Sequence, residues 1–126
     1  MANPSDTGSS GVGSETLRRR YVDGSAESEQ IVCAGVANHI MTILSVVICS
    51  VGSPADSIFE LKVDYDLGGT DMYLLRDVPV GTEETFIFND KIVLTDTDRL
   101  LFIASSASGT AAFDLYCSYI DQEFTT

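Results

Sequence analysis

The segment SIFELKVDYD, residues 57–66, carries the clearest structural signal in the chain. Apolar and charged side chains alternate along it. One face is formed by Phe59, Leu61, Val63 and Tyr65, and the other by Glu60, Lys62, Asp64 and Asp66. A period of two predicts a β-strand with one face on a core and the other in water. The LGG sequence at 67–69 is a turn signal, so residues 72–78 are predicted to return as the second strand of a hairpin.

Short apolar runs of the same kind occupy the rest of the chain from residue 16. They cover residues 16–22, 29–34, 36–50, 85–88, 92–94, 99–104 and 112–121, with polar or Gly-containing turn signals between them. The longest run, 36–50, is long enough for a helix, but most of its large apolar side chains are β-branched, which favours a strand. Apart from residues 16–22, which mostly belong to the N-terminal arm, these runs give about seven or eight strands near ten residues apart, and this pattern predicts an all-β protein. We expect an antiparallel β-sandwich or jelly roll with an extended N-terminal arm.

The chain of 126 residues has the length of one domain. Its first 15 residues, MANPSDTGSSGVGSE, are small and polar, and alone they cannot bury enough apolar surface to become ordered. We therefore predict an extended polar arm over residues 1–20 and a β-sandwich domain over residues 21–126. Deleting residues 1–20 is accordingly expected to leave the domain folded.

The charge of the chain is strongly negative, at −12. Residues 31–126 hold fourteen acidic and four basic residues, so the predicted domain repels phosphate backbones, and we expect no nucleic-acid partner. The most continuously apolar part of the 36–50 run, residues 40–49, has about ten residues and is too short to cross a bilayer, so no membrane partner is expected. No secretory signal is visible at the polar N-terminus, which indicates synthesis and use in a cytoplasm.

Three cysteines, Cys33, Cys49 and Cys117, lie inside apolar runs and form no C-x-x-C pair. An odd number of cysteines without nearby histidines favours free, buried thiols in a reducing compartment.

No motif predicts an enzyme. The single histidine, His39, lies in the most apolar run and cannot build a metal cluster alone, so we interpret it as a core or strand-end residue rather than part of a Ser-His-Asp triad. Glycoside hydrolysis needs two carboxyl groups facing a sugar cleft. The chain has no tryptophan, and its tyrosines and phenylalanines mostly fall on predicted inward faces. Phosphate-binding glycine motifs are also missing. We predict no catalytic residues and no cofactor.

Aspartates gather at two predicted turns. They are Asp64, Asp66 and Asp71 around one hairpin, and Asp96 and Asp98 on a later turn. Calcium binds oxygen ligands on such loops, but no D-x-[DN]-x-[DN]-G loop with a distal glutamate is present. Side-chain hydrogen bonds to the backbone explain aspartates in turns equally well. We predict no metal site.

The three consecutive arginines, Arg18, Arg19 and Arg20, are the candidate partner-binding site. Strand alternation would place Arg18 and Arg20 on one side and Arg19 on the other. Forked hydrogen bonds from guanidinium groups to carboxylates would let them clasp a partner surface. Two alternatives remain: a solvated edge strand whose charge discourages aggregation, and a weak contact with nucleic acid.

Four segments carry a resemblance to a known class of proteins. SETLRRRYV (14–22), TILSVVICSVG (42–52), GTEETFIFNDKIVLTDTDRL (81–100) and DLYCSYIDQ (114–122) together resemble small β-sandwich virion proteins of tailed bacteriophages. The resemblance covers residues 14–122 and involves strands and turns, not catalytic residues.

The resemblance implies a structural role in the virion after assembly in the host cytoplasm. Such proteins often decorate or cement the phage head as symmetric oligomers, bound to the major capsid protein or other virion proteins, with N-terminal arms that run across neighbouring subunits. Others form part of the neck, portal or tail, and this alternative stays open. A carbohydrate- or calcium-binding attachment module is the remaining alternative.

Overall fold

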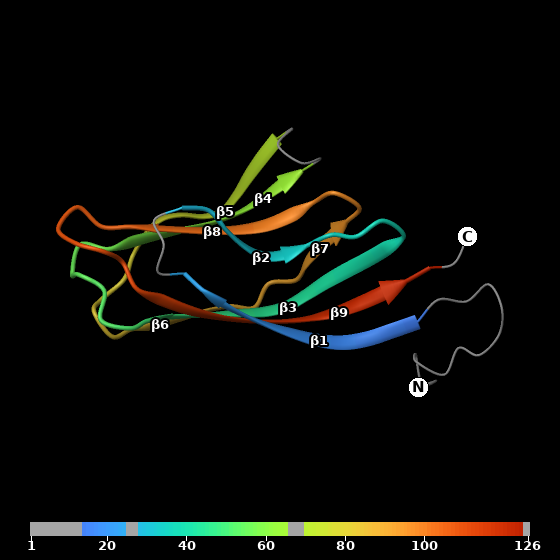
Figure 1. Cartoon of the computed structure of the whole chain (residues 1–126), viewed down its shortest axis with the longest axis horizontal. Helices are drawn as coiled ribbons and strands as arrows, with labels where there is room; N and C mark the ends of the chain where they lie inside the picture. The colour runs from blue at the N-terminus through green and yellow to red at the C-terminus, as the bar shows by residue number, and fades with distance from the viewer. Residues whose placement is uncertain (1–13, 25–27, 66–69, 125–126) are drawn as a thin grey trace.

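The computed structural model describes residues 14–24, 28–65 and 70–124. The regular structure among these residues is all β-strand, and none of them belongs to a helix that could span a lipid bilayer. The described strands are β1 (Ser14–Asp23), β2 (Gln30–Ala34), β3 (His39–Ser50), β4 (Ile58–Tyr65), β5 (Thr70–Pro79), β6 (Thr85–Phe88), β7 (Ile92–Thr95), β8 (Arg99–Ser105) and β9 (Phe113–Glu123). Figure 1 shows two layers, with β1, β3, β6 and β9 in the lower layer and β2, β4, β5 and β8 in the upper one.

The two layers are antiparallel sheets. The five-stranded sheet has the order β1-β9-β3-β6, with β7 also paired to β3, and the four-stranded sheet has the order β2-β8-β4-β5. Because β6 pairs with residues 46–49 of β3 and β7 with residues 40–43, the two act as one interrupted strand. Counted in this way, eight strands are distributed between the sheets in the order of a jelly roll. This arrangement confirms the prediction of an antiparallel, jelly-roll-like β-sandwich.

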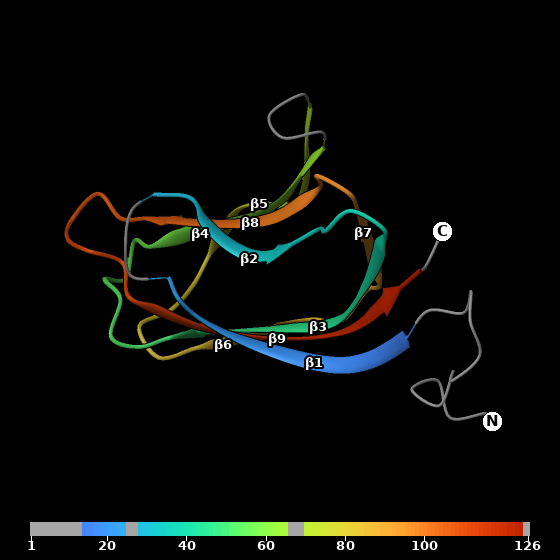
Figure 2. The same cartoon turned by 45° about the vertical axis from the view of Figure 1, so that its right-hand side comes forward.

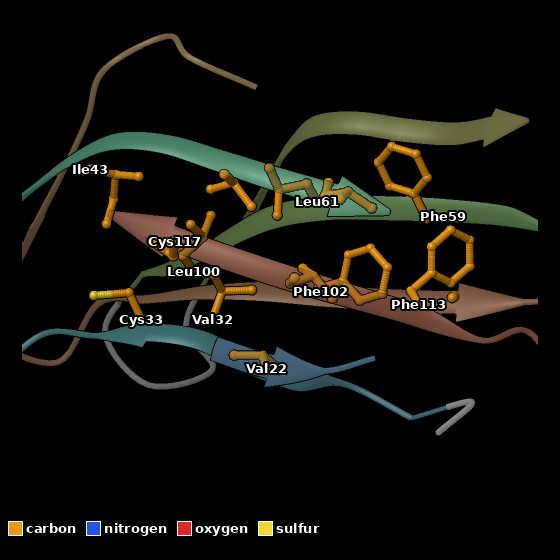
Figure 3. Close-up of a cluster of buried hydrophobic side chains, with 14 of the residues drawn as sticks. Val22, Val32, Cys33, Ile43, Phe59, Leu61, Leu100, Phe102, Phe113 and Cys117 are labelled. Carbon is orange, nitrogen blue, oxygen red and sulfur yellow. The ribbon is translucent and has the colours of Figure 1, made fainter. Parts of the chain in front are cut away.

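The core lies between the sheets and is centred on aromatic rings. Phe59 and Phe102 come from the four-stranded sheet, whereas Phe86 and Phe113 come from the five-stranded one. The ring centroids of Phe59 lie 5.6 Å from Phe86, 5.7 Å from Phe102 and 6.1 Å from Phe113. Aliphatic side chains and two thiols extend the cluster along the sandwich (Figure 3), among them Val22, Val32, Cys33, Ile43, Leu61, Leu100 and Cys117.

The outward face of β4 differs from the prediction. It was expected to lie in water, but Lys62 and Asp64 are only 7% and 2% exposed. The Lys62 Nζ atom lies 2.7 Å from Glu29 Oε1 and 3.0 Å from Asp71 Oδ2, and Asp64 forms an ion pair with Arg99. The alternation correctly placed Lys62 and Asp64 on the side of the sheet away from the core. Their partners from neighbouring segments nevertheless cover both side chains.

The thiols also differ in part from the prediction. All three cysteines are free, but only Cys33 and Cys117 are buried, whereas Cys49 is half-buried. Burial raises the pKa of Cys33 to about 11 and that of Cys117 to about 12. Because the thiolate is the reactive form, these two thiols are inert at neutral pH.

A carboxyl pair on the four-stranded sheet gives a pH-dependent prediction. The pKa of Glu60 is raised by burial, and further by a hydrogen bond to Asp77 and by its like charge. A raised pKa in the folded state means that the ionised carboxylate destabilises the fold at neutral pH, and that stability is recovered as the pH falls through this pKa. Asp77 has a φ of 49°, a left-handed conformation that asparagine also tolerates.

We therefore expect Asp77→Asn to raise the free energy of unfolding at pH 7. The gain should shrink as the pH falls to about 4, where Glu60 is largely protonated in both states. Thermal melts of wild type and variant at both pH values measure the effect. Asp96→Asn, at an exposed position with a similar left-handed φ of 55°, is the matched control and should change little. A variant that is less stable than wild type at pH 7 would contradict the prediction.

Candidate partner-binding surface

Strand β1 is an edge strand of the five-stranded sheet (Figure 2). It pairs with β9 in an antiparallel register that runs from Ser14 opposite Glu123 to Asp23 opposite Asp114. The predicted arm over residues 1–20 therefore overlaps the sheet, because residues 14–20 belong to β1, while residues 1–13 lie outside the described residues. The expectation that deleting residues 1–20 leaves the domain folded is corrected. Such a deletion would strip most of β1 from β9.

The three arginines of β1 alternate between its two sides, as predicted. Arg18 lies opposite Tyr119 and Arg20 opposite Cys117, whereas Arg19 lies opposite Ser118 on the outer side of the sheet. All three side chains are exposed. Only Arg18 forms an ion pair within the described part of the chain, so the role of Arg18, Arg19 and Arg20 in binding a partner stays a prediction.

The partner of Arg18 is Asp121, a buried carboxylate that the sequence analysis missed. Asp121 Oδ2 accepts a hydrogen bond from Arg18 Nε at 3.0 Å, and Asp121 Oδ1 lies 2.6 Å from His39 Nδ1. These residues belong to β9, β1 and β3, so one side chain links three adjacent strands. The alternation along β9 could have revealed this residue, because Asp121 falls at the next inward position after the apolar residues of that strand.

His39 is a strand-end residue, as predicted, since it begins β3. A histidine–carboxylate pair is also part of a Ser-His-Asp triad. Within the described residues, however, no serine or cysteine is hydrogen-bonded to the His39 ring. The pair therefore has a structural explanation, as a link between β3 and β9.

The outward side of the five-stranded sheet carries two apolar rows that cross its strands. The registers place Val93, Thr42, Ile120 and Leu17 in one row, and Ile87, Val47, Tyr116 and Tyr21 in the other. We call these eight residues the outer apolar face. Five of them, Leu17, Tyr21, Ile87, Val93 and Tyr116, are between 42% and 71% exposed.

A hollow of about 240 Å³ lies at the β1–β9 side of this face. It is lined by Leu17, Arg18, Arg19, Tyr116 and Ser118, so it opens between the two apolar rows. Its walls combine apolar side chains with guanidinium groups and a hydroxyl group. Such a hollow fits a protruding side chain of a partner surface.

Charged residues lie between and beyond the rows of the outer apolar face, and Glu15, opposite Gln122, lies beyond the Leu17 row. Arg19 lies between its two rows, and Asp23 and Asp114 face each other beyond the Tyr21 row. The Tyr21 hydroxyl donates a 2.6 Å hydrogen bond to Asp114, which raises the pKa of Tyr21. The tyrosines and phenylalanines together mostly lie inward, as predicted, but Tyr21, Tyr73 and Tyr116 are exposed.

Several described aspartates of the acidic turns have partners within the chain. Asp64 and Asp71 form ion pairs with basic neighbours, and Asp98 accepts a hydrogen bond from the Thr95 backbone N–H at 3.1 Å. Asp66 lies outside the described residues. Among the residues that the structure describes, no group of three or more His, Cys, Asp or Glu side chains is placed to hold a metal ion.

Comparisons with known proteins support the fold. No family model matches the chain, and no curated protein sequence matches it. Among solved structures, the chain is similar to a chain from the acid-stable capsid of Helicobacter pylori bacteriophage KHP30, with 13% identity and a TM-score of 0.51. The match covers 84% of this chain and 86% of that one. At this level of identity the likeness shows the fold alone.

Weaker similarity extends to two other structures. One is the VP2 subviral particle of infectious bursal disease virus, with 11% identity, 87% of this chain covered and a TM-score of 0.46. The chain spans only 38% of the length of that VP2 chain. The other is a Bacillus endospore appendage described as a disulfide-linked pilus, with 13% identity, coverage of 93% and 95%, and a TM-score of 0.44.

Proposed function

We propose that this chain is a non-enzymatic structural protein of a tailed-phage virion. It would decorate and cement the head by binding the major capsid protein or another virion protein as a homo-oligomer, after assembly in the host cytoplasm. The observation that carries the proposal is the outer apolar face. Its exposed apolar side chains gather on one sheet face in two rows, with Arg19, Ser118 and Ser45 between them, and such a gathering marks an interaction site. The resemblance over residues 14–122 and the jelly-roll fold support the same role.

The proposed mechanism is mechanical. The sandwich presents an apolar sheet face for assembly, and the N-terminal segment reaches a neighbouring subunit. Arg19 and Arg20, which form no ion pair with described residues, would bind carboxylates on that neighbour. Many weak contacts on one lattice raise the effective concentration of each, and binding to the assembled particle then stabilises it by mass action.

Removal of residues 1–13 tests this role without removing β1 from the sheet. We expect the truncated protein to melt close to the full-length protein, but its occupancy on purified particles should fall by at least about tenfold. Quantitative mass spectrometry of sedimented particles measures the occupancy. The double variant Arg19→Ala/Arg20→Ala should also weaken binding, whereas Arg76→Ala, an exposed arginine of β5, should not. Full occupancy of the truncated protein would contradict the arm mechanism.

A head–tail or tail component is the second candidate. The same apolar face would serve a ring at the neck or tail as well as a lattice on the head. Copy number per particle separates the two positions. On the order of hundreds of copies support head decoration, and about six or twelve support a neck or tail ring.

One observation favours the third candidate, an attachment module. Tyr21 and Tyr116 lie directly opposite each other on exposed strand positions, and aromatic rings of this kind can stack on sugars. A glycan panel tests this alternative, and melting with and without EDTA tests calcium binding. A specific glycan signal, or a clear shift of Tm with EDTA, would favour attachment over cementing.

A further inference from the structure

We propose that the outer apolar face docks a second copy of this chain. The two five-stranded sheets would pack face to face around a two-fold axis. This inference deepens the proposed structural role, on which it rests, by naming the surface through which copies assemble.

The size of the five-stranded sheet fits such an interface. Four strand positions lie side by side, formed by β1, β9, β3 and the interrupted strand β6–β7, and β1 and β3 are 10 and 12 residues long. With about 4.8 Å between strands and about 3.3 Å per residue, the sheet presents roughly 700 Å². A standard interface buries about 800 Å² on each partner. No described strand covers this side of the sheet (Figures 1 and 2).

The side chains on the face suit close packing. Tyr21 and Tyr116 are large and have few rotatable bonds, so fixing them costs little conformational entropy. The β-branched residues of the rows stand nearly upright on the sheet, and the rows of two facing sheets can interdigitate about 10 Å apart. The hollow beside Leu17 and Tyr116 can receive a side chain from the opposite copy.

Two in-plane two-fold axes would bring apolar rows together. We infer the axis that runs parallel to the strands through the middle of the face, because the perpendicular axis would place Arg19 of one copy against Arg19 of the other. The parallel axis places Leu17 of one copy against Val93 of the other, and Tyr21 against Ile87. An interface of this kind is self-complementary, as a closed dimer requires.

Charge is consistent with the same axis. Although the chain carries −12, Arg19 is the charged residue between the two rows. Residues 89–91 connect β6 to β7 at the opposite edge of the sheet, at the same height as Arg19. The axis therefore brings Arg19 of one copy to the loop of the other that carries the exposed Asp90 and Lys91. Asp90 supplies a carboxylate to the guanidinium group, while Lys91 adds a like charge beside it.

Sedimentation equilibrium of the full-length protein tests the proposal. Wild type is expected at twice the monomer mass. Val93→Asp and Ile87→Asp should each raise the dimer dissociation constant at least about tenfold, because each would bury an unpaired carboxylate. Met72→Asp is the matched control on the other sheet, with a side chain 51% exposed against 54% for Val93, and it should leave the dimer unchanged. Thermal melts show that each variant is folded.

Four outcomes would overturn the docking face. Wild type could be monomeric at every concentration, or it could form an oligomer of odd order. The substitutions Val93→Asp and Ile87→Asp could leave the dimer intact. Finally, the protein could be a monomer that binds particles only when Val93 is unchanged. The last outcome would mean that the capsid, not a second copy, covers the face. Particle binding is scored separately. A dimer that fails to bind virions would support the docking face and contradict the proposed function. A monomer that binds virions would support the proposed function and contradict the docking face.

Discussion

Phe59→Ala is expected to destabilise the protein by about 3–5 kcal/mol, the largest effect of any substitution considered for this chain. Phe59 is fully buried and lies against three other phenylalanine rings, two of which come from the opposite sheet. Its loss would leave a cavity at the place where the two sheets meet. Because a small domain is stable by only about 5–15 kcal/mol, the variant should lose much of its folded population.

Chemical denaturation and thermal melting measure this loss, and Tm should fall by roughly 4–8 °C for each kcal/mol. Phe59→Leu keeps most of the volume and should cost far less. Phe124→Ala removes the same ring from a position that is 45% exposed, so it should change stability by less than about 0.5 kcal/mol. If Phe59→Ala behaved like Phe124→Ala, the aromatic cluster would not hold the sheets together.

Asp121→Ala should cost about 2–3 kcal/mol. The substitution removes the buried acceptor of Arg18 and leaves the half-buried His39 ring without its partner. Because Arg18 is partly exposed, solvent screens the ion pair between Arg18 and Asp121. The expected loss of stability therefore stays below the upper range for buried ion pairs. Hydrogen exchange in β1 should become faster, since β1 loses its side-chain link to β9.

A double-mutant cycle shows whether Asp121 acts through His39. The variants Asp121→Ala and His39→Ala should couple by about 1 kcal/mol or more, because each removes the same hydrogen bond. Asp114→Ala is the control on the same strand, where the carboxylate binds Tyr21 at the surface, and its cost should stay under about 1 kcal/mol. Additive losses for Asp121 and His39 would mean that the 2.6 Å contact contributes little to stability.

Local periodicity was sufficient to predict the strands. The strict alternation of residues 57–66 predicted a strand, and β4 covers Ile58–Tyr65. Two separate short runs at 85–88 and 92–94 correspond to β6 and β7. These predictions succeeded because a strand with one face on a core imposes its period on a few neighbouring residues.

Pairing between distant strands could not be predicted in the same way. The alternation of β1 fits any neighbour equally well, so nothing local shows that it pairs with β9, about a hundred residues away. The covered positions of Lys62 and Asp64 and the outer apolar face follow from such pairings. The sequence did place Tyr116 outward, but the two rows exist only once four strands are in register.

The inward phase of a single charged residue was nevertheless available as a signal. Asp121 follows Phe113, Leu115, Cys117 and Tyr119 at intervals of two, which placed a carboxylate on the inward side of β9. A lone charge in an apolar phase predicts a buried partner. The identity of the partners, Arg18 and His39, depended on the tertiary structure.

The pairing of Ser14 with Glu123 has a practical consequence for anyone attaching cargo to this scaffold. Payloads fused ahead of β1 and behind β9 would leave from the same end of the sandwich, while the β3–β4 and β8–β9 connections lie at the far end. Two fluorophores, one ahead of β1 and one behind β9, would show energy transfer typical of a short distance. A peptide of a few residues that links Glu123 to Ser14 could also give a circular permutant whose new termini lie elsewhere in the chain.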